Sequence, residues 1–69
     1  MKYRFLLTNR EGASGSFEWN LESDTSARMM ATEIVLGVTC VQDITIYRLL
    51  GVDSCGPIVY IATVRSSDL

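Results

Sequence analysis

The chain has 69 residues, of which 48% are apolar and 20% are charged, and its formal net charge is -2. This length allows a single domain, and the apolar content is too high for a disordered chain. The mild excess of acidic residues argues against a protein that binds a phosphate backbone through clustered lysine and arginine.

Alternation of apolar and polar residues predicts two antiparallel strands at the start of the chain. They cover about residues 2–8 and 16–22, with apolar positions at Tyr3, Phe5 and Leu7, and at Phe17, Trp19 and Leu21. A hairpin folded symmetrically about Gly12 places Phe5 opposite Trp19, which pairs two aromatic rings. On the other face, the same register places Lys2 opposite Glu22.

A helix is predicted next, over about residues 24–36. Ser23 and Asp24 are suitable residues for its N-terminus, and Gly37 is a suitable residue for its end. The apolar positions recur at helical spacing at Ala27, Met30, Ala31, Ile34 and Val35. We expect this stripe to pack on the aromatic residues of the first two strands, with Trp19 in the core.

Two further strands are predicted at about residues 42–50 and 58–65. The order ββαββ indicates an α+β fold, in which residues 1–69 form one domain with a four-stranded antiparallel sheet and one helix on one face. A hairpin followed by a helix favours the strand order 2-1-3-4. The position of the last strand is the least constrained part of this arrangement.

Cys40 and Cys55 lie beyond the two ends of the third predicted strand. That strand separates them by roughly 30 Å, whereas a disulfide needs Cα atoms within about 7 Å. Two free thiols are typical of a reducing compartment. The N-terminus lacks the long apolar segment of a signal peptide, and no stretch is long enough to span a membrane. We therefore expect a cytoplasmic protein without membrane contact.

The last strand is apolar on both faces, although one helix can cover only one side of a sheet. Pairing the last two strands about Ser54 places a set of apolar residues on the uncovered face. This set comprises Leu6, Tyr47, Leu49, Val59 and Ile61. A contiguous apolar surface of a few hundred Å² often marks an interaction site, so this set is the expected contact surface.

No residue pattern predicts an enzyme, a cofactor site or a metal site. The chain contains no histidine, which removes the commonest general base and metal ligand. Glu18 and Glu22 share a strand face, but four residues of strand hold them roughly 13 Å apart. Paired glycosidase carboxylates lie about 5–9.5 Å apart, so a solvated strand face is the better interpretation.

We therefore expect a non-catalytic protein–protein interaction module. One hypothesis is a homodimer that packs the apolar face or joins the edges of the last strand. A second is an inhibitor or adaptor of the kind phages and mobile elements encode, which would bind a host protein through an acidic edge at Glu18, Glu22 and Asp24. The alternative is a single-stranded nucleic-acid-binding protein, in which Tyr47 stacks on bases beside arginine side chains.

Overall fold

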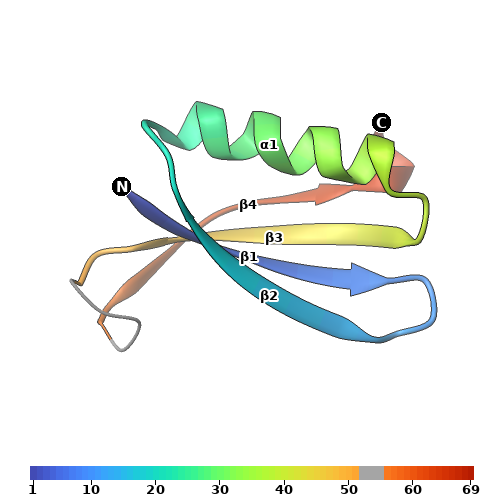
Figure 1. Ribbon diagram of the computed structural model, residues 1–69, viewed down its shortest axis with the longest axis horizontal. Coiled ribbons are helices and arrows are strands. Elements are labelled where there is room, and N and C mark those ends of the chain that lie inside the picture. Colours follow the sequence, from blue (N-terminus) through green and yellow to red (C-terminus); the bar gives the residue numbers. More distant parts are fainter. Residues whose placement is uncertain (52–55) are drawn as a thin grey trace.

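A four-stranded antiparallel sheet with one helix packed on it forms the protein in the computed structural model, which describes residues 1–51 and 56–69. The elements are β1 (Lys2–Asn9), β2 (Ser14–Asn20), α1 (Asp24–Gly37), β3 (Val41–Leu49), β4 (Ile58–Arg65) and the 3-10 helix η1 (Ser66–Asp68). The strand order is β2-β1-β3-β4 (Figure 1). The predicted α+β fold, element order and strand order are confirmed.

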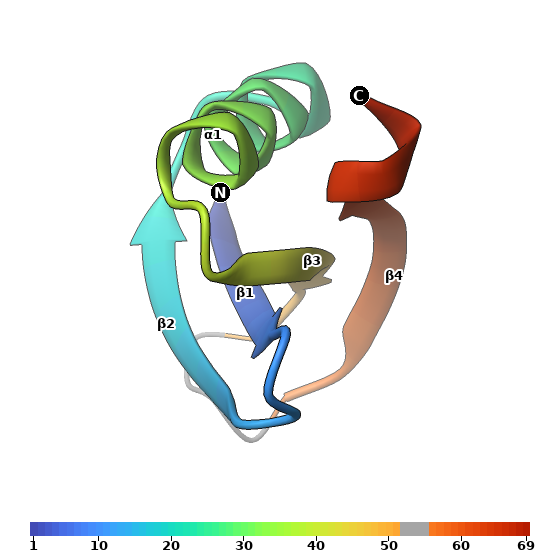
Figure 2. The ribbon, with the colours of Figure 1, turned by 90° about the vertical axis from the view of Figure 1, so that its right-hand side faces the viewer.

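Helix α1 and η1 lie on the same side of the sheet, with β2 and β4 at its two edges (Figure 2). We call the opposite side the outer face; in the described part of the chain, no helix covers it. No helix in residues 1–51 or 56–69 is long and apolar enough to cross a membrane. Cys40 is exposed with a free thiol, while Cys55 lies outside the described residues.

The core lies between α1 and the sheet and is free of buried polar side chains among the described residues. It consists of Tyr3, Phe5, Ala27, Ala31, Val35, Val41, Ile44 and Ile46. The helix contributes small residues here, so it can lie close to β3 and β4 while the large aromatic rings fill the space over β1. The predicted helical stripe is confirmed.

Both ends of α1 have hydrogen-bond partners for exposed backbone groups. The Ser23 side chain accepts a hydrogen bond of 3.1 Å from the N–H of Ser26, as an N-cap residue does. At the other end, the N–H of Val38 donates to the carbonyl of Ile34 at 2.8 Å. The chain is extended at Val38, which directs it into β3.

The hairpin between β1 and β2 is centred on Glu11, and the Asn9 side chain organises the loop between the strands. The Asn9 side-chain oxygen accepts from the N–H groups of Glu11 and Ala13, at 3.0 and 2.9 Å. Gly12 takes a φ of 89°, a left-handed conformation that glycine adopts at no steric cost. The predicted centre at Gly12 was therefore wrong, and β2 begins and ends two residues earlier than expected.

This register changes every predicted pair but preserves the faces, because the shift is two residues. Phe5 lies opposite Phe17, with the two rings stacked at a centroid distance of 4.9 Å. Lys2 lies opposite Asn20 and not opposite Glu22.

The prediction of Trp19 in the core was wrong. It lies opposite Tyr3 on the helix side of the sheet, yet it is 56% exposed. The reason is the position of the helix, which lies against β3 and β4 and not over β2 at the far edge.

A β-bulge in β4 divides that strand into two halves. Ile46 lies opposite Ala62, but the next residue, Tyr47, lies opposite Tyr60. Ile61 is therefore an extra residue without a counterpart in β3. The predicted pairing about Ser54 is correct from the bulge to Arg65 and is shifted by one residue before it.

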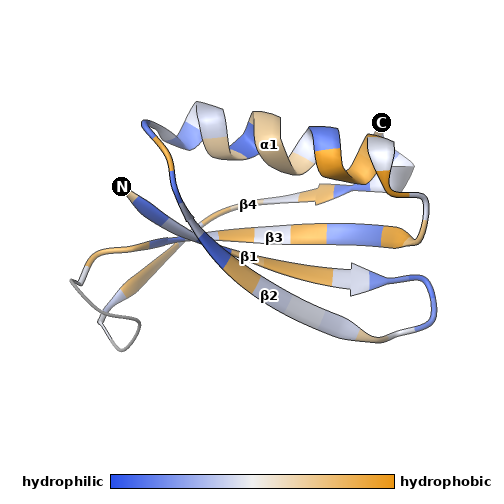
Figure 3. Cartoon of the chain, viewed as in Figure 1, coloured by the Kyte–Doolittle hydropathy of each residue, from blue (hydrophilic) through white to orange (hydrophobic). Residues whose placement is uncertain are grey.

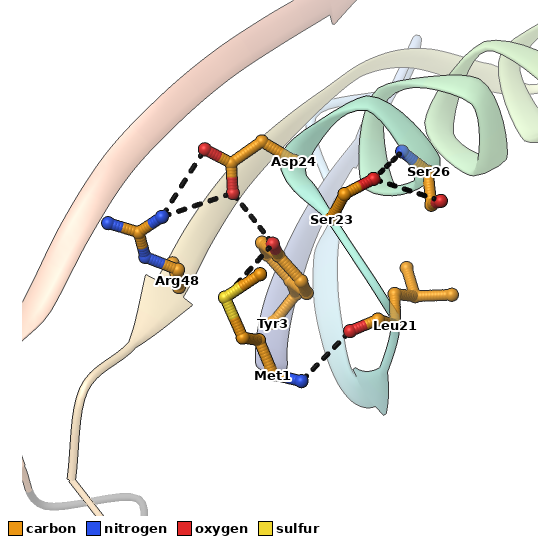
Figure 4. Close-up of polar contacts among 7 residues, drawn as sticks. All are labelled: Met1, Tyr3, Leu21, Ser23, Asp24, Ser26 and Arg48. Atoms are coloured by element: carbon orange, nitrogen blue, oxygen red, sulfur yellow. Dashed lines mark hydrogen bonds and ion pairs between the residues drawn. The ribbon is translucent and has the colours of Figure 1, made fainter.

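Three side chains join the N-terminal turn of α1 to β1 and β3 (Figure 4). The Tyr3 hydroxyl donates a 2.6 Å hydrogen bond to Oδ1 of Asp24, and Arg48 Nη1 lies 3.3 Å from both carboxylate oxygens. Burial, followed by the hydrogen bond to Asp24, raises the pKa of Tyr3 from 10.0 to about 12. The carboxylate in the first helical turn also interacts favourably with the helix dipole.

Candidate interaction surface

The outer face consists of four rows of side chains that run across the sheet from β2 to β4. The two central rows are Glu18, Arg4, Tyr47 and Tyr60, and Ser16, Leu6, Thr45 and Thr63. The two flanking rows are Asn20, Lys2, Leu49 and Ile58, and Ser14, Thr8, Asp43 and Arg65. Residues directly opposite one another in an antiparallel pair share a face, so the register of the sheet fixes these rows.

The β1–β2 half of this face carries charged side chains that pair with one another. Arg4 donates from Nε and Nη2 to Oε2 of Glu18, at 3.2 and 3.0 Å. Lys2 Nζ lies 3.8 Å from the other oxygen of the same carboxylate. One acidic side chain thus binds two basic ones, and the pairs reduce the positive charge that a nucleic-acid surface would offer.

The β3–β4 half is aromatic and apolar around Tyr47, Tyr60 and Ile58, and polar toward Asp43 and Arg65 at its other end. The rings of Tyr47 and Tyr60 meet edge to face, with centroids 6.1 Å apart and an interplanar angle of 70°. Tyr60 is 58% exposed and Ile58 is 48% exposed, while Leu6 on β1 is 37% exposed. Figure 3 shows hydrophobic colour along much of β4, in contrast to the largely pale and blue β2.

A small hydroxyl cluster lies beside the tyrosine pair. The Thr63 hydroxyl is 3.0 Å from the Tyr60 hydroxyl and 3.3 Å from that of Thr45. The Tyr60 hydroxyl thus has a hydrogen-bond partner on its own strand. We call Ile58, Tyr60, Tyr47 and Leu6 the outer patch.

The structure places only part of the predicted contact set on the outer face. Leu6 and Tyr47 are there as expected. Leu49 is there too, but it is only 6% exposed and so offers little contact area. Val59 lies opposite Arg48 on the helix side, and Ile61 packs against the core, so the placement of both on the outer face was wrong.

The bulge at Ile61 explains this difference. Because it adds one residue to β4, every residue before it changes face relative to an uninterrupted strand. Ile58 and Tyr60 therefore take the outer positions that the sequence interpretation gave to Val59 and Ile61. No glycine or proline marks the bulge within β4, and a strand that is apolar on both faces has no periodicity that would reveal it.

The three acidic residues of the predicted acidic edge do not form one surface. Glu18 lies on the outer face with its basic partners, and Asp24 is bonded to Tyr3 and Arg48 at the start of α1. Glu22 is exposed in the segment between β2 and α1. The sheet and the helix thus use two of these carboxylates for internal contacts.

Hydrogen bonds at the strand ends identify the backbone groups that face the free edges. The N–H of Leu50 donates to the carbonyl of Pro57 at 2.9 Å. In an antiparallel pair of strands, residues that bond to the neighbouring strand in this way alternate with residues whose N–H and C=O point away from it. The alternation along β3 is unbroken at the bulge. The residues of β4 on both sides of Ile61 can therefore be assigned from their partners in β3. The edge-facing residues of β4 are Ile58, Tyr60, Thr63 and Arg65.

The edge-facing residues of β2, at the other edge of the sheet, are assigned in the same way, and their side chains are polar. The N–H of Leu21 donates to the carbonyl of Met1 at 2.8 Å, which fixes the alternation along β2. Its edge-facing residues are Ser14, Ser16, Glu18 and Asn20. All four are polar and one is charged, features that discourage edge pairing. The β4 edge starts with two large apolar or aromatic residues and is uncharged until Arg65.

No protein-family model matches the chain, and no significant match is found among curated proteins or solved structures. The functional proposal therefore rests on the geometry of the outer face and of the two sheet edges.

Proposed function

We propose that this protein is a non-catalytic protein-binding module that associates with a second copy of itself through the β3–β4 half of its sheet. The observation that carries this proposal is the outer patch, where Tyr60 and Ile58 are about half exposed on a sheet face without a covering helix in the described residues. Exposed aromatic and aliphatic side chains in one contiguous group are typical of interfaces.

The distribution of charge supports the same half of the sheet. The core of a protein–protein interface is depleted of charged residues and enriched in tyrosine. The outer patch contains two tyrosines in contact, whereas the charged side chains of the central row, Arg4 and Glu18, bind one another on the β1–β2 side. The outer patch itself carries no charged side chain, so it can lose its water without burying a charge.

The small size of the domain also supports self-association. A chain of this length buries only about 60% of the surface that its unfolded form exposes, and oligomerisation is one of the ways in which such small domains gain stability. Self-association through β3 and β4 leaves Trp19 and Glu22 near the opposite edge accessible. That edge is where a second protein, such as the target of an inhibitor or adaptor, would bind.

The test is the solution mass by light scattering over a dilution series in reducing buffer. We expect a dimer for the wild-type chain and a monomer for Tyr60→Asp, because the new carboxylate would be buried without a partner. Met29→Asp is the matched control, since Met29 is equally exposed but lies on α1. It should remain dimeric.

A wild-type chain that stays monomeric at every concentration would overturn self-association. So would a Met29→Asp variant that dissociates while Tyr60→Asp does not. Circular dichroism of each variant shows whether the fold is retained, so that loss of the dimer can be assigned to the surface.

A further inference from the structure

We infer that two copies join their β4 edges antiparallel about a two-fold axis, so that the two four-stranded sheets continue into one. This inference rests on the self-association proposed above and specifies its geometry. Its basis is the set of edge-facing residues of β4, whose N–H and C=O groups point away from β3. An unpaired sheet edge fits another extended strand, and a second β4 supplies the same donors and acceptors.

One symmetric register pairs all four edge-facing residues with edge-facing residues of the second copy. In that register, Ile58 lies opposite Arg65 of the second copy and Tyr60 lies opposite its Thr63. The bulge is compatible with this register, because residues 61 and 62 of one strand lie opposite residues 62 and 61 of the other at the two-fold axis.

Charge favours the same register. Arg65 is the only charged residue of β4, and the register places the two copies of it at opposite ends of the shared edge. Each Arg65 then has Asp43 opposite it on its own β3 and Ile58 of the second copy on the other side. The strand pairing therefore brings no like charges together.

The outer patch adjoins this edge and enlarges the contact. A standard interface buries about 800 Å² per partner, close to a fifth of the 4408 Å² accessible surface of this chain. Strand pairing alone covers less than that. Tyr60 and Ile58 supply additional area, because both are edge-facing residues whose exposed side chains would pack against the second copy's β4.

The β2 edge is the internal comparison. It is also an outer strand, but its edge-facing residues are polar throughout and include Glu18, whose carboxylate binds Arg4 and Lys2. A second copy at that edge would bring two copies of this charged group near one another. The structure thus assigns the shared edge to β4.

The first test compares Tyr60→Ala with Tyr60→Pro by light scattering and dilution. Both remove the phenol ring, but only proline removes the edge-facing N–H and blocks the strand edge, while the bonds from β4 to β3 are untouched. We expect the dimer dissociation constant to rise by about tenfold or more from the alanine to the proline variant. Ser16→Pro, at an edge-facing position of β2, should leave the dimer unchanged.

Equal dissociation constants for the two Tyr60 variants would overturn edge pairing and would leave self-association through the outer face standing. A wild-type monomer would instead overturn the proposed function itself. Loss of the dimer in Ser16→Pro, with its fold retained, would assign the shared edge to β2 and would also contradict the inference.

The second test does not depend on a proline variant that folds. In the inferred register, Val59 faces Val64 of the second copy in a non-hydrogen-bonded pair, with Cα atoms about 4.5 Å apart, a distance that a disulfide spans. Within one chain, these residues are five strand positions and so roughly 16 Å apart. We place Val59→Cys and Val64→Cys, singly and together, in a Cys40→Ser, Cys55→Ser background.

Mild oxidation should give a covalent dimer with the double cysteine variant and none with either single variant. A covalent dimer from Val59→Cys alone would mean that residue 59 lies at the two-fold axis, and the register would be wrong. Absence of a covalent dimer in the double variant, measured at a concentration where the chain is dimeric, would overturn edge pairing.

Discussion

The hydroxyl of Tyr3 donates a 2.6 Å hydrogen bond to Oδ1 of Asp24, 21 residues further along the chain. Tyr3 is completely buried in β1, and Asp24 occupies the first turn of α1. The bond therefore fixes the start of the helix over the sheet, and Arg48 of β3 binds the same carboxylate. This cluster thus joins the first turn of α1 to both β1 and β3.

We expect Tyr3→Phe to lower the free energy of unfolding by about 1 kcal/mol, because it removes one hydrogen bond but keeps the ring in the core. The carboxylate of Asp24 retains Arg48, so no buried charge is left alone. Chemical denaturation measures the change. Tyr60→Phe is the control, because the Tyr60 hydroxyl lies on the exposed outer face, and a larger effect there would contradict this assignment.

Stability should also depend on pH in the alkaline range. The folded pKa of Tyr3, about 12, lies above its ordinary value of 10.0, so the unfolded chain loses this proton first. The contribution of Tyr3 is thus fully present below pH 10 and is lost as the pH rises to about 12. Denaturation curves across this range should show the loss in the wild-type chain, and Tyr3→Phe should lack that part of it.

Trp19 is the only tryptophan, and its side chain is 56% exposed on the helix side of β2. We expect its fluorescence to be quenched by a soluble quencher in the folded protein nearly as well as in denaturant. Dimerisation through β4 should leave the quenching unchanged, because β2 is the opposite edge of the sheet. Strong protection in the folded monomer would contradict the exposed position.

Removing the Trp19 ring should lower the free energy of unfolding far less than removing a ring from the core. We expect Phe5→Ala to destabilise by about 3–5 kcal/mol, as for other buried aromatic residues. Trp19→Ala should cost clearly less, because much of its side chain is already in water. Thermal or chemical unfolding of the two variants makes the comparison, and equal losses would show that Trp19 belongs to the core.

Gly12→Ala should destabilise the hairpin by about 1–2 kcal/mol, because a φ of 89° is strained for a residue with a Cβ. Among the described residues, no atom beyond the two chain neighbours lies within 4 Å of the added methyl group, so the loss comes from the backbone conformation. Gly15→Ala is the matched control, since it has the same free space without a positive φ. It should leave stability nearly unchanged.

Local patterns were sufficient to predict the element order, the strand order and the helical stripe. Apolar residues recur with periods of 2 and 3.6 residues along the sequence, which indicates strands and a helix. A hairpin followed by a helix then allows few strand orders. The hairpin register was missed by two residues because Asn9 determines the loop through its side-chain hydrogen bonds. That contact depends on the conformation of the loop, which alternation alone does not specify.

The candidate surface was predicted less well than the fold. Leu6 and Tyr47 lie on the outer face, where the alternation places them. The bulge puts Ile58 and Tyr60 on that face in place of Val59 and Ile61. The sequence by itself determined that β4 is apolar on both faces and that one helix could cover only one of them. Tertiary packing decided which residues face outward, because the core takes both Ile61 and Ala62 and so forces the strand to shift by one residue.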